Sequence, residues 1–257
     1  MDLKLTGKRA FVSGSTQGIG YAIAEALIAE GASVVINGRD ETRVRQVVAR
    51  LGAESGIVAD FADSRQVQQL LDDLGDVDIL VNNVGLFEVS PFDAISDEDW
   101  QRYVEVNLMS GVRLSRSVLP GMLARNDGRI IFIGSESGVN IPADMLHYGV
   151  TKAGMLALSN GLAKLTRGSA VTVNTVLGGP TYSDGVAAAV EQIAGAQGMS
   201  PLDLKAAIIG GNQTSIVQRF IDPSEIASLV TYLASPLASA TNGAALRADG
   251  GVLTAML

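Results

Sequence analysis

The sequence predicts an α/β fold in which a doubly wound, seven-stranded parallel sheet carries helices on both faces. Short apolar runs rich in β-branched residues alternate with longer segments whose apolar residues recur every three or four positions, as in repeated strand–helix–strand units. Hydrophobic residues make up 47% of the 257 residues and charged residues 18%, which is enough apolar surface for a compact core. We therefore expect residues 1–257 to form a single domain.

Each expected strand is a short apolar run, at Arg9–Ser13, Ser33–Asn37, Ser55–Ala59, Ile79–Asn82, Arg129–Gly134, Thr172–Val176 and Ala244–Arg247. The expected helices have amphipathic spacing, at Ile19–Glu30, Glu41–Leu51, Ser64–Leu74, Asp97–Ala124, Leu146–Thr166 and Pro223–Ala234. Residues 182–215 interrupt the alternation with glycines and a weak amphipathic pattern, so they form either a substrate lid or a surface helical insertion. Sheets of this kind bind ligands beyond the carboxyl ends of their strands, where we expect the functional residues.

The composition narrows the possible functions. The net charge is −8, with 19 basic and 27 acidic residues and no Lys/Arg cluster, which argues against a nucleic-acid partner. With no cysteine and a single histidine, His147, disulfides and thiolate nucleophiles are excluded and we expect no metal site. The start of the chain lacks a signal-peptide core and no apolar run could span a bilayer, so we expect a cytoplasmic protein with no membrane partner.

Three glycines mark a dinucleotide site. Gly14, Gly18 and Gly20 lie between the first expected strand and the helix that follows it. A turn without side chains lets the backbone approach a pyrophosphate, and the N-terminus of the helix offers N–H groups to the negative charge. Glycines that serve only close strand–helix packing are the less favoured interpretation in this setting.

The end of the second expected strand indicates which dinucleotide binds. Gly38 stands where an acidic residue would accept hydrogen bonds from the adenosine ribose of NAD, and Arg39 follows it. A guanidinium can pair with the 2′-phosphate of NADP, so NADP(H) is favoured and NAD(H) is possible. The alternative is that Arg39 is solvated or pairs with Asp40 or Glu41.

With these motifs in order, the chain resembles the classical short-chain dehydrogenase/reductase family over essentially its whole length, and the 3-oxoacyl carrier-protein reductase type in particular. The resemblance also rests on Asp60, on Asn82-Asn83-Val84-Gly85, and on Asp249-Gly250-Gly251. It implies a Rossmann-like fold and a catalytic tetrad of Asn107, Ser135, Tyr148 and Lys152. Together with Arg39, the implied cofactor contacts are Gly14, Ser15, Thr16, Gln17, Gly18, Ile19, Gly20, Asp60, Phe61, Asn83, Val84, Gly85, Tyr148, Lys152, Gly178, Gly179 and Thr181.

The tetrad suits hydride transfer between a nicotinamide cofactor and a carbonyl or alcohol. Tyr148 and Lys152 are four residues apart on one helical face, where a nearby ammonium would lower the pKa of the tyrosine. The resemblance implies that Ser135 binds the reacting oxygen and that Asn107 holds a water in a relay to Lys152. The substrate would be a 3-oxoacyl compound, a sugar or another small ketone or secondary alcohol. The alternative is a catalytically silent NAD(P)-binding sensor or regulator.

Several features leave alternatives open. Gly178 replaces the proline usual in the family before Gly179, so we expect a less rigid loop there, with Thr181 as a cofactor contact. Glu136 either reaches a polar substrate or faces solvent. The helices at Asp97–Ala124 and Leu146–Thr166 resemble those that form subunit contacts in the family, so we expect a homotetramer.

Overall fold

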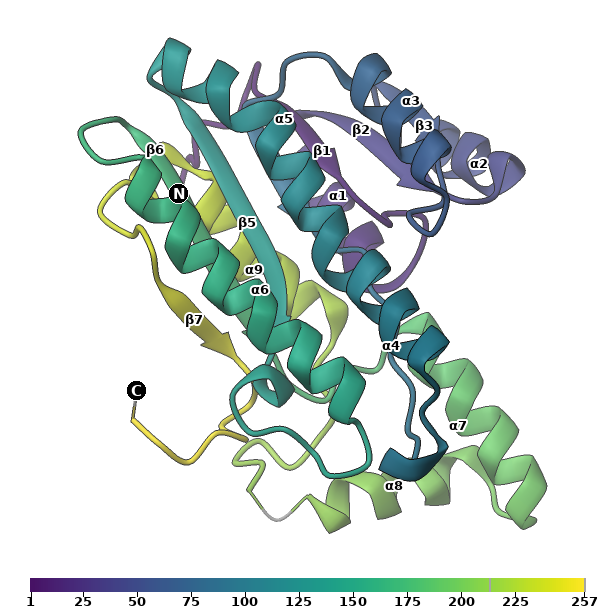
Figure 1. Ribbon diagram of the computed structural model, residues 1–257. Coiled ribbons are helices and arrows are strands. Elements are labelled where there is room, and N and C mark those ends of the chain that lie inside the picture. The colour runs from purple at the N-terminus through teal and green to yellow at the C-terminus, as the bar shows by residue number, and fades with distance from the viewer. Residues whose placement is uncertain (213, 257) are drawn as a thin grey trace.

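A computed structural model describes residues 1–212 and 214–256 (Figure 1). Its seven strands form one parallel sheet in the order β3-β2-β1-β4-β5-β6-β7, which confirms the predicted fold class. The chain winds outward from β1 to β3, returns to β4 beside β1, and then winds the other way. The strand order therefore reverses between β1 and β4, which is where doubly wound sheets bind ligands.

The strand bounds are β1 Arg9–Val12, β2 Ser33–Gly38, β3 Ser55–Val58, β4 Ile79–Asn82, β5 Gly128–Ser135, β6 Val171–Gly178 and β7 Ala245–Ala248. The α-helices are α1 Gly18–Ala29, α2 Glu41–Leu51, α3 Ser64–Leu74, α4 Asp97–Tyr103, α5 Ser110–Arg125, α6 Leu146–Leu165, α7 Asp184–Gln197, α8 Pro201–Gly211 and α9 Pro223–Ala234. Strands β5 and β6 are longer than expected at both ends, because eight consecutive residue pairs join them.

Alternating side chains of the strands build a core on each face of the sheet. In β1, Phe11 packs on one face, while Val12 packs on the other. The Val12 face is covered by α1, α2 and α9, and the Phe11 face by α3, α5 and α6 (Figure 1). Within the described ranges, no helix is both long and apolar enough to cross a membrane.

Capping explains why some helices begin and end where the sequence predicts. The Asp40 carboxylate accepts a hydrogen bond from the backbone N–H of Arg43 at the start of α2, and Gly52 ends that helix with φ +64°. At α9, Asp222 and Glu225 form a reciprocal capping box around Pro223. The local sequence is thus sufficient to set these boundaries.

The single helix predicted over Asp97–Ala124 is wrong in one respect. After α4 the chain widens into a π-helical turn, η2 Val104–Met109, before α5 begins. Asn107 lies in this turn, and its side-chain amide binds both backbone groups of Leu86. A single π turn inside a helix is rare, and the apolar spacing of residues 97–124 alone predicted one regular helix.

The segment expected to be a substrate lid or a surface helical insertion contains two helices, α7 and α8. Helices α7 and α8 lie at the carboxyl-end edge of the sheet, beyond the end of β6 (Figure 1). They bury a small apolar cluster of their own, formed by Val190, Ala194 and Leu204. This segment therefore lies over the same edge as the expected site.

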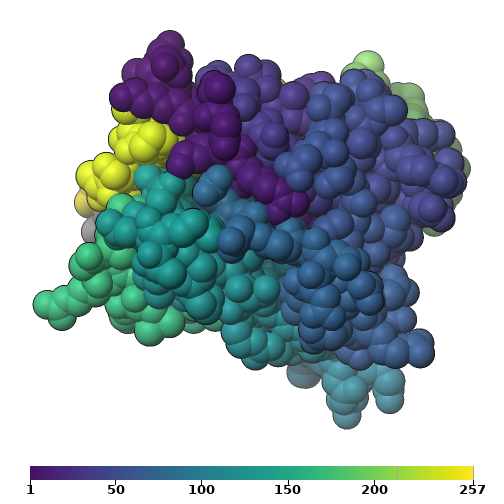
Figure 2. Space-filling model, turned by 90° about the horizontal axis from the view of Figure 1, so that it is seen from above, coloured from purple at the N-terminus to yellow at the C-terminus, as the bar shows by residue number. Residues whose placement is uncertain are grey.

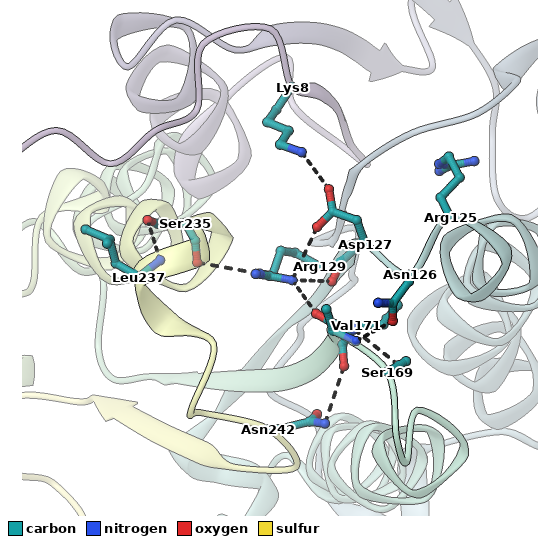
Figure 3. Close-up of polar contacts among 12 residues, drawn as sticks. Lys8, Arg125, Asn126, Asp127, Arg129, Ser169, Val171, Ser235, Leu237 and Asn242 are labelled. Carbon is teal, nitrogen blue, oxygen red and sulfur yellow. Dashed lines mark hydrogen bonds and ion pairs between the residues drawn. The ribbon is translucent and has the colours of Figure 1, made fainter.

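At the opposite edge of the sheet, where the strands begin, a buried arginine links several segments by hydrogen bonds (Figure 3). Arg129 is 5% exposed, and its Nη1 donates to the carbonyls of Gly128 and Ala170, both at 2.8 Å, while Nε donates to the Ser235 carbonyl at 3.5 Å. The Ser235 hydroxyl in turn donates to the Leu3 carbonyl. Figure 2 shows this edge, with the N-terminal residues in purple beside the C-terminal part of the chain in yellow.

Candidate active site

A cavity of about 640 Å³ opens over the carboxyl ends of β1, β2, β4 and β5. Among the predicted cofactor contacts it is lined by Gly14, Thr16, Gln17, Gly18, Ile19, Gly20, Arg39, Asp60, Phe61, Asn83, Val84, Gly85, Tyr148 and Lys152. Its long, open form runs from the end of β2 to the tyrosine on α6. The described residues include no group of three His, Asp or Glu side chains that could hold a metal ion.

The glycine turn leaves space that side chains would fill. Gly14 and Gly18 have φ values of +62° and +57°, in the left-handed region that glycine tolerates. A Cβ atom on Gly20 would lie 2.4 Å from the Gly14 carbonyl oxygen and 2.5 Å from Nδ2 of Asn83. The turn therefore presents bare backbone to the cavity, which suits a dinucleotide pyrophosphate.

Side chains below the turn fix its shape. The Ser13 hydroxyl accepts from the N–H groups of Asn83 and Val84, and Nδ2 of Asn83 donates to the carbonyls of Ser13 and Gly14. Ser15 is fully buried and its hydroxyl accepts from the Asn37 N–H, so its side chain faces away from the cavity. The side chains of Ser15 and Asn83 thus hold the turn in place.

The segment after β6 differs from expectation. Gly178 is the last residue of β6 and pairs with Ser135 of β5 and Ala248 of β7, so the less rigid loop predicted at this position is wrong. Gly178, Gly179 and Thr181 do not line the cavity. Thr181 is buried, and its hydroxyl donates to the Gly179 carbonyl.

The residues of this segment that do reach the cavity are Ser183 and Gly185. Between them, the Asp184 carboxylate accepts a hydrogen bond from the Gly18 N–H at 2.6 Å. The Asp184 carboxylate therefore already accepts a hydrogen bond from one of the backbone N–H groups that would otherwise face a pyrophosphate. Sequence reasoning missed these contacts, because they join residues 166 positions apart.

Two arginines lie at the other end of the cavity. The Arg39 side chain is 68% exposed, and its Nη1 lies 3.9 Å from Oδ2 of Asp60. Asp40 caps α2 and Glu41 pairs with Arg45 instead, so the alternative pairings considered for Arg39 are not the ones that form. Arg43 also lines the cavity. The signal for it was its position in the first turn of α2, four residues after Arg39.

The predicted tetrad converges at the α6 end of the cavity. Lys152 is 4% exposed, its Nζ donates to the Ile133 carbonyl at 2.7 Å, and it lies 5.7 Å from the ring centroid of Tyr148. A Cβ atom on Gly85 would lie 3.6 Å from both Lys152 Nζ and Asn107 Oδ1. The lysine and the asparagine therefore approach the same point of the backbone after β4.

Asn107 is fully buried, and both polar atoms of its side chain form hydrogen bonds within the protein. Its Oδ1 accepts from the Leu86 N–H at 2.7 Å, and its Nδ2 donates to the Leu86 carbonyl and to the Thr151 hydroxyl, both at 3.0 Å. Asn107 thereby fixes η2 to the chain after β4 and to α6.

Burial shifts the pKa values of the tyrosine and the lysine in opposite directions. It raises the pKa of Tyr148 to about 12, an effect opposed by the Ser135 hydroxyl and reinforced by the Glu136 charge. It lowers the pKa of Lys152 to about 8, and the Glu136 charge opposes this shift. In both cases the low-dielectric surroundings disfavour the charged form. Near neutral pH, Tyr148 therefore holds its proton.

Ser135 has a carboxylate partner. At the end of β5 its hydroxyl donates to Oε2 of Glu136 at 2.5 Å, and the Ser137 hydroxyl donates to Oε1 at 3.2 Å. Glu136 therefore does not simply face solvent, because its side chain is half-buried and bonded to the serine.

His147, next to Tyr148 on α6, does not line the cavity. It is 1% exposed, and its ring centroid lies 3.9 Å from that of Tyr103 and 6.2 Å from that of Trp100. Its Nδ1 has no hydrogen-bond partner among the described residues. These contacts give His147 a packing role between α4 and α6.

Known proteins resemble this chain in sequence and in structure. Residues 8–194 match the short chain dehydrogenase family. An uncharacterized oxidoreductase, YvrD, of Bacillus subtilis is 42% identical over 263 residues, covering 100% of both chains. The 3-oxoacyl-[acyl-carrier-protein] reductase FabG of Salmonella typhimurium is 35% identical, covering 97% of this chain and 99% of the other. The structure of L-sorbose reductase from Gluconobacter frateurii, complexed with NADPH and L-sorbose, superposes with a TM-score of 0.93 at 30% identity and covers 100% of both chains.

Proposed function

Since this chain belongs to the short-chain dehydrogenase family, we propose that it transfers hydride between NADP(H) and a small carbonyl or secondary-alcohol substrate. Family membership confirms the prediction of an oxidoreductase over that of a silent sensor. The observation that carries the proposal is the convergence of Tyr148, Lys152, Ser135 and Asn107 beside the end of a cavity whose other half is a glycine turn. That arrangement places proton-transfer groups next to a dinucleotide site.

The residues at this end divide the chemistry among them. When bound, the nicotinamide supplies hydride to the carbonyl carbon, or accepts it in oxidation. The Tyr148 hydroxyl donates its proton to the developing alkoxide in reduction, and Ser135 donates a hydrogen bond to the same oxygen. The Lys152 ammonium stabilises the tyrosinate left behind, since an opposite charge favours the ionised phenol. Asn107 positions Tyr148 and Lys152 indirectly, because its hydrogen bond to Thr151 holds η2 against α6.

The cavity suits the cofactor proposed from the sequence. Gly14, Gly18 and Gly20 leave room for a pyrophosphate, and Arg39 and Arg43 supply cations at the adenosine end. Guanidinium groups pair well with a phosphate monoester, and glycine rather than a carboxylate stands at position 38, at the end of β2, where an acidic residue would bind a ribose of NAD. The Salmonella and Gluconobacter relatives are named as reductases, and the latter structure contains NADPH.

The same proposal covers the organisation of the protein. Residues 1–257 act as one domain in the cytoplasm, and α7 and α8 form a lid over the substrate. Apolar side chains at Val104, Val150 and Leu165 are 38%, 45% and 63% exposed along η2 and α6, which supports burial of these helices in a homotetramer. A monomer in sedimentation equilibrium would contradict the tetramer.

Cofactor titration with a ketone and alcohol panel tests the function. NADPH and NADH binding are measured on the wild type, on Arg39→Ala and on Arg45→Ala, an exposed arginine of the same region that pairs with Glu41. We expect Arg39→Ala to weaken NADPH binding about tenfold, as loss of a charge-assisted contact, without changing NADH affinity. Arg45→Ala should leave both unchanged. An unaltered NADPH preference in Arg39→Ala, or no NADPH-dependent reduction of any ketone, would contradict the proposal.

A further inference from the structure

The hydroxyl of the catalytic serine can donate only one hydrogen bond, and a neighbouring carboxylate accepts it. Ser135 donates to Oε2 of Glu136 at 2.5 Å, while Ser137 donates to Oε1 at 3.2 Å. Within residues 1–212 and 214–256 no Lys or Arg forms an ion pair with Glu136. The carboxylate is therefore held by hydroxyl groups alone, and each of its oxygens retains lone pairs for a further donor.

The hydrogen bond from Ser135 places the Glu136 carboxylate beside the proposed catalytic serine. Its charge affects both catalytic side chains, raising the pKa of Tyr148 and opposing the fall in the pKa of Lys152. To stabilise a substrate oxygen, the Ser135 hydroxyl must donate its hydrogen bond to that oxygen. In the absence of substrate, the hydroxyl donates to Glu136 instead. A simple ketone brings no donor in exchange, so turning the serine toward it would leave the carboxylate short of one hydrogen bond. Such an exchange is costly when the acceptor is charged and half-buried.

A substrate with a hydroxyl on the carbon next to the carbonyl removes this cost. When its two C–O bonds eclipse, the hydroxyl and the carbonyl oxygen lie side by side, as do the Ser135 hydroxyl and the Glu136 carboxylate. The substrate hydroxyl can then donate to Glu136, and the serine proton turns to the carbonyl oxygen. A 2-oxo acid would instead place a carboxylate against Glu136, where the like charges repel.

We propose that Glu136 is a specificity-determining residue that binds the hydroxyl adjacent to the reacting carbonyl, so that α-hydroxy ketones and vicinal diols are the substrates of this site. The inference rests on the proposed function. In reduction, R–CO–CH₂OH, NADPH and a proton give R–CHOH–CH₂OH and NADP⁺. The carbonyl carbon gains hydride, its oxygen gains the Tyr148 proton, and the α-hydroxyl remains intact.

Three compounds with a common ethyl group test the selection. They are 2-butanone, 1-hydroxy-2-butanone and 2-oxobutanoate, which place a methyl, a hydroxymethyl and a carboxylate at the same position. For the wild type we expect kcat/KM for the hydroxy ketone to exceed that for 2-butanone by about ten- to a hundredfold, the effect of one hydrogen bond to a charged group. The 2-oxo acid should be the poorest of the three. In Glu136→Ala the preference for the hydroxy ketone should fall about tenfold or more, and reduction of 2-butanone should persist.

Two controls distinguish a loss of substrate preference from a general loss of activity. Glu98→Ala removes an exposed carboxylate from the first turn of α4 and should leave the preference intact. A second readout needs no turnover: calorimetry of 1-hydroxy-2-butanone binding to Tyr148→Phe with NADPH, compared with Tyr148→Phe/Glu136→Ala, should show about tenfold weaker binding in the double variant.

The outcomes distinguish the two proposals. Reduction of all three compounds by the wild type without preference, or a preference that survives in Glu136→Ala, would overturn the role of Glu136 and leave the proposed function standing. No reduction of any of them, while NADPH binds and other ketones are reduced, would also overturn the inference alone. Failure with every ketone would overturn both.

Discussion

Replacing Gly20 by alanine tests whether this position needs glycine because neighbouring atoms leave no room for a side chain. In a helix interior alanine is favoured over glycine by about 1 kcal/mol. At Gly20, however, the new methyl group would lie 2.4 Å from the Gly14 carbonyl oxygen and 2.5 Å from Asn83 Nδ2. Neither atom moves freely, because Nδ2 of Asn83 is bonded to the carbonyls of both Ser13 and Gly14. Overpacking of this kind costs about 1–3 kcal/mol.

We therefore expect Gly20→Ala to lower the free energy of unfolding by up to about 2 kcal/mol, the overpacking cost less the helix preference. NADPH affinity should fall about tenfold or more, because the displaced atoms form the pyrophosphate turn. Gly195→Ala in α7 is the matched control, since nothing lies within 4 Å of its Cβ position, and it should gain about 0.5–1 kcal/mol. Urea denaturation and fluorescence titration measure the two quantities. A Gly20→Ala protein as stable as Gly195→Ala and with unaltered NADPH affinity would refute the reasoning.

Three further predictions follow from single contacts. Arg129→Met should cost about 2–4 kcal/mol of unfolding free energy by stranding buried carbonyls, with NADPH affinity unchanged; equal stability in urea would be the contrary result. Asp184→Ala should tighten NADPH binding about three- to tenfold by freeing the Gly18 N–H, whereas weaker binding would show that the carboxylate assists the cofactor. Because the pKa of Lys152 is lowered to about 8 while that of Tyr148 is about 12, kcat/KM for reduction should be constant below pH 8 and fall as Lys152 loses its charge above it. Glu136→Gln should move this fall to lower pH, and a profile identical to the wild type would disagree.

The sequence was informative wherever local chemistry determines structure. Strand–helix alternation predicted the strand content and the doubly wound sheet, and amphipathic spacing predicted both ends of α2, where Asp40 and Gly52 cap the helix. The glycine turn was predictable because its conformation depends on residues close together in the chain. Tyr148 and Lys152 were predictable as neighbours, since four residues bring side chains together on any helix.

Contacts between distant segments were not predictable in this way. The bond from Gly18 to Asp184 depends on how the chain leaves β6, and no local pattern encodes that direction. The π turn at Asn107 was missed because the apolar spacing predicted one regular helix there. Gly178 was expected in a loop because the family resemblance draws attention to a missing proline, yet its neighbours Ser135 and Ala248 hold it in the sheet.

Proton donation by Tyr148 is the central claim, and one variant tests it directly. Tyr148→Phe removes the hydroxyl and keeps the ring, so the protein should fold and bind NADPH as the wild type does. With a ketone that the wild type reduces, the consumption of NADPH should slow by about 10²–10⁴-fold, the usual contribution of a positioned general acid. Turnover close to that of the wild type, in a protein shown to bind NADPH, would contradict the account.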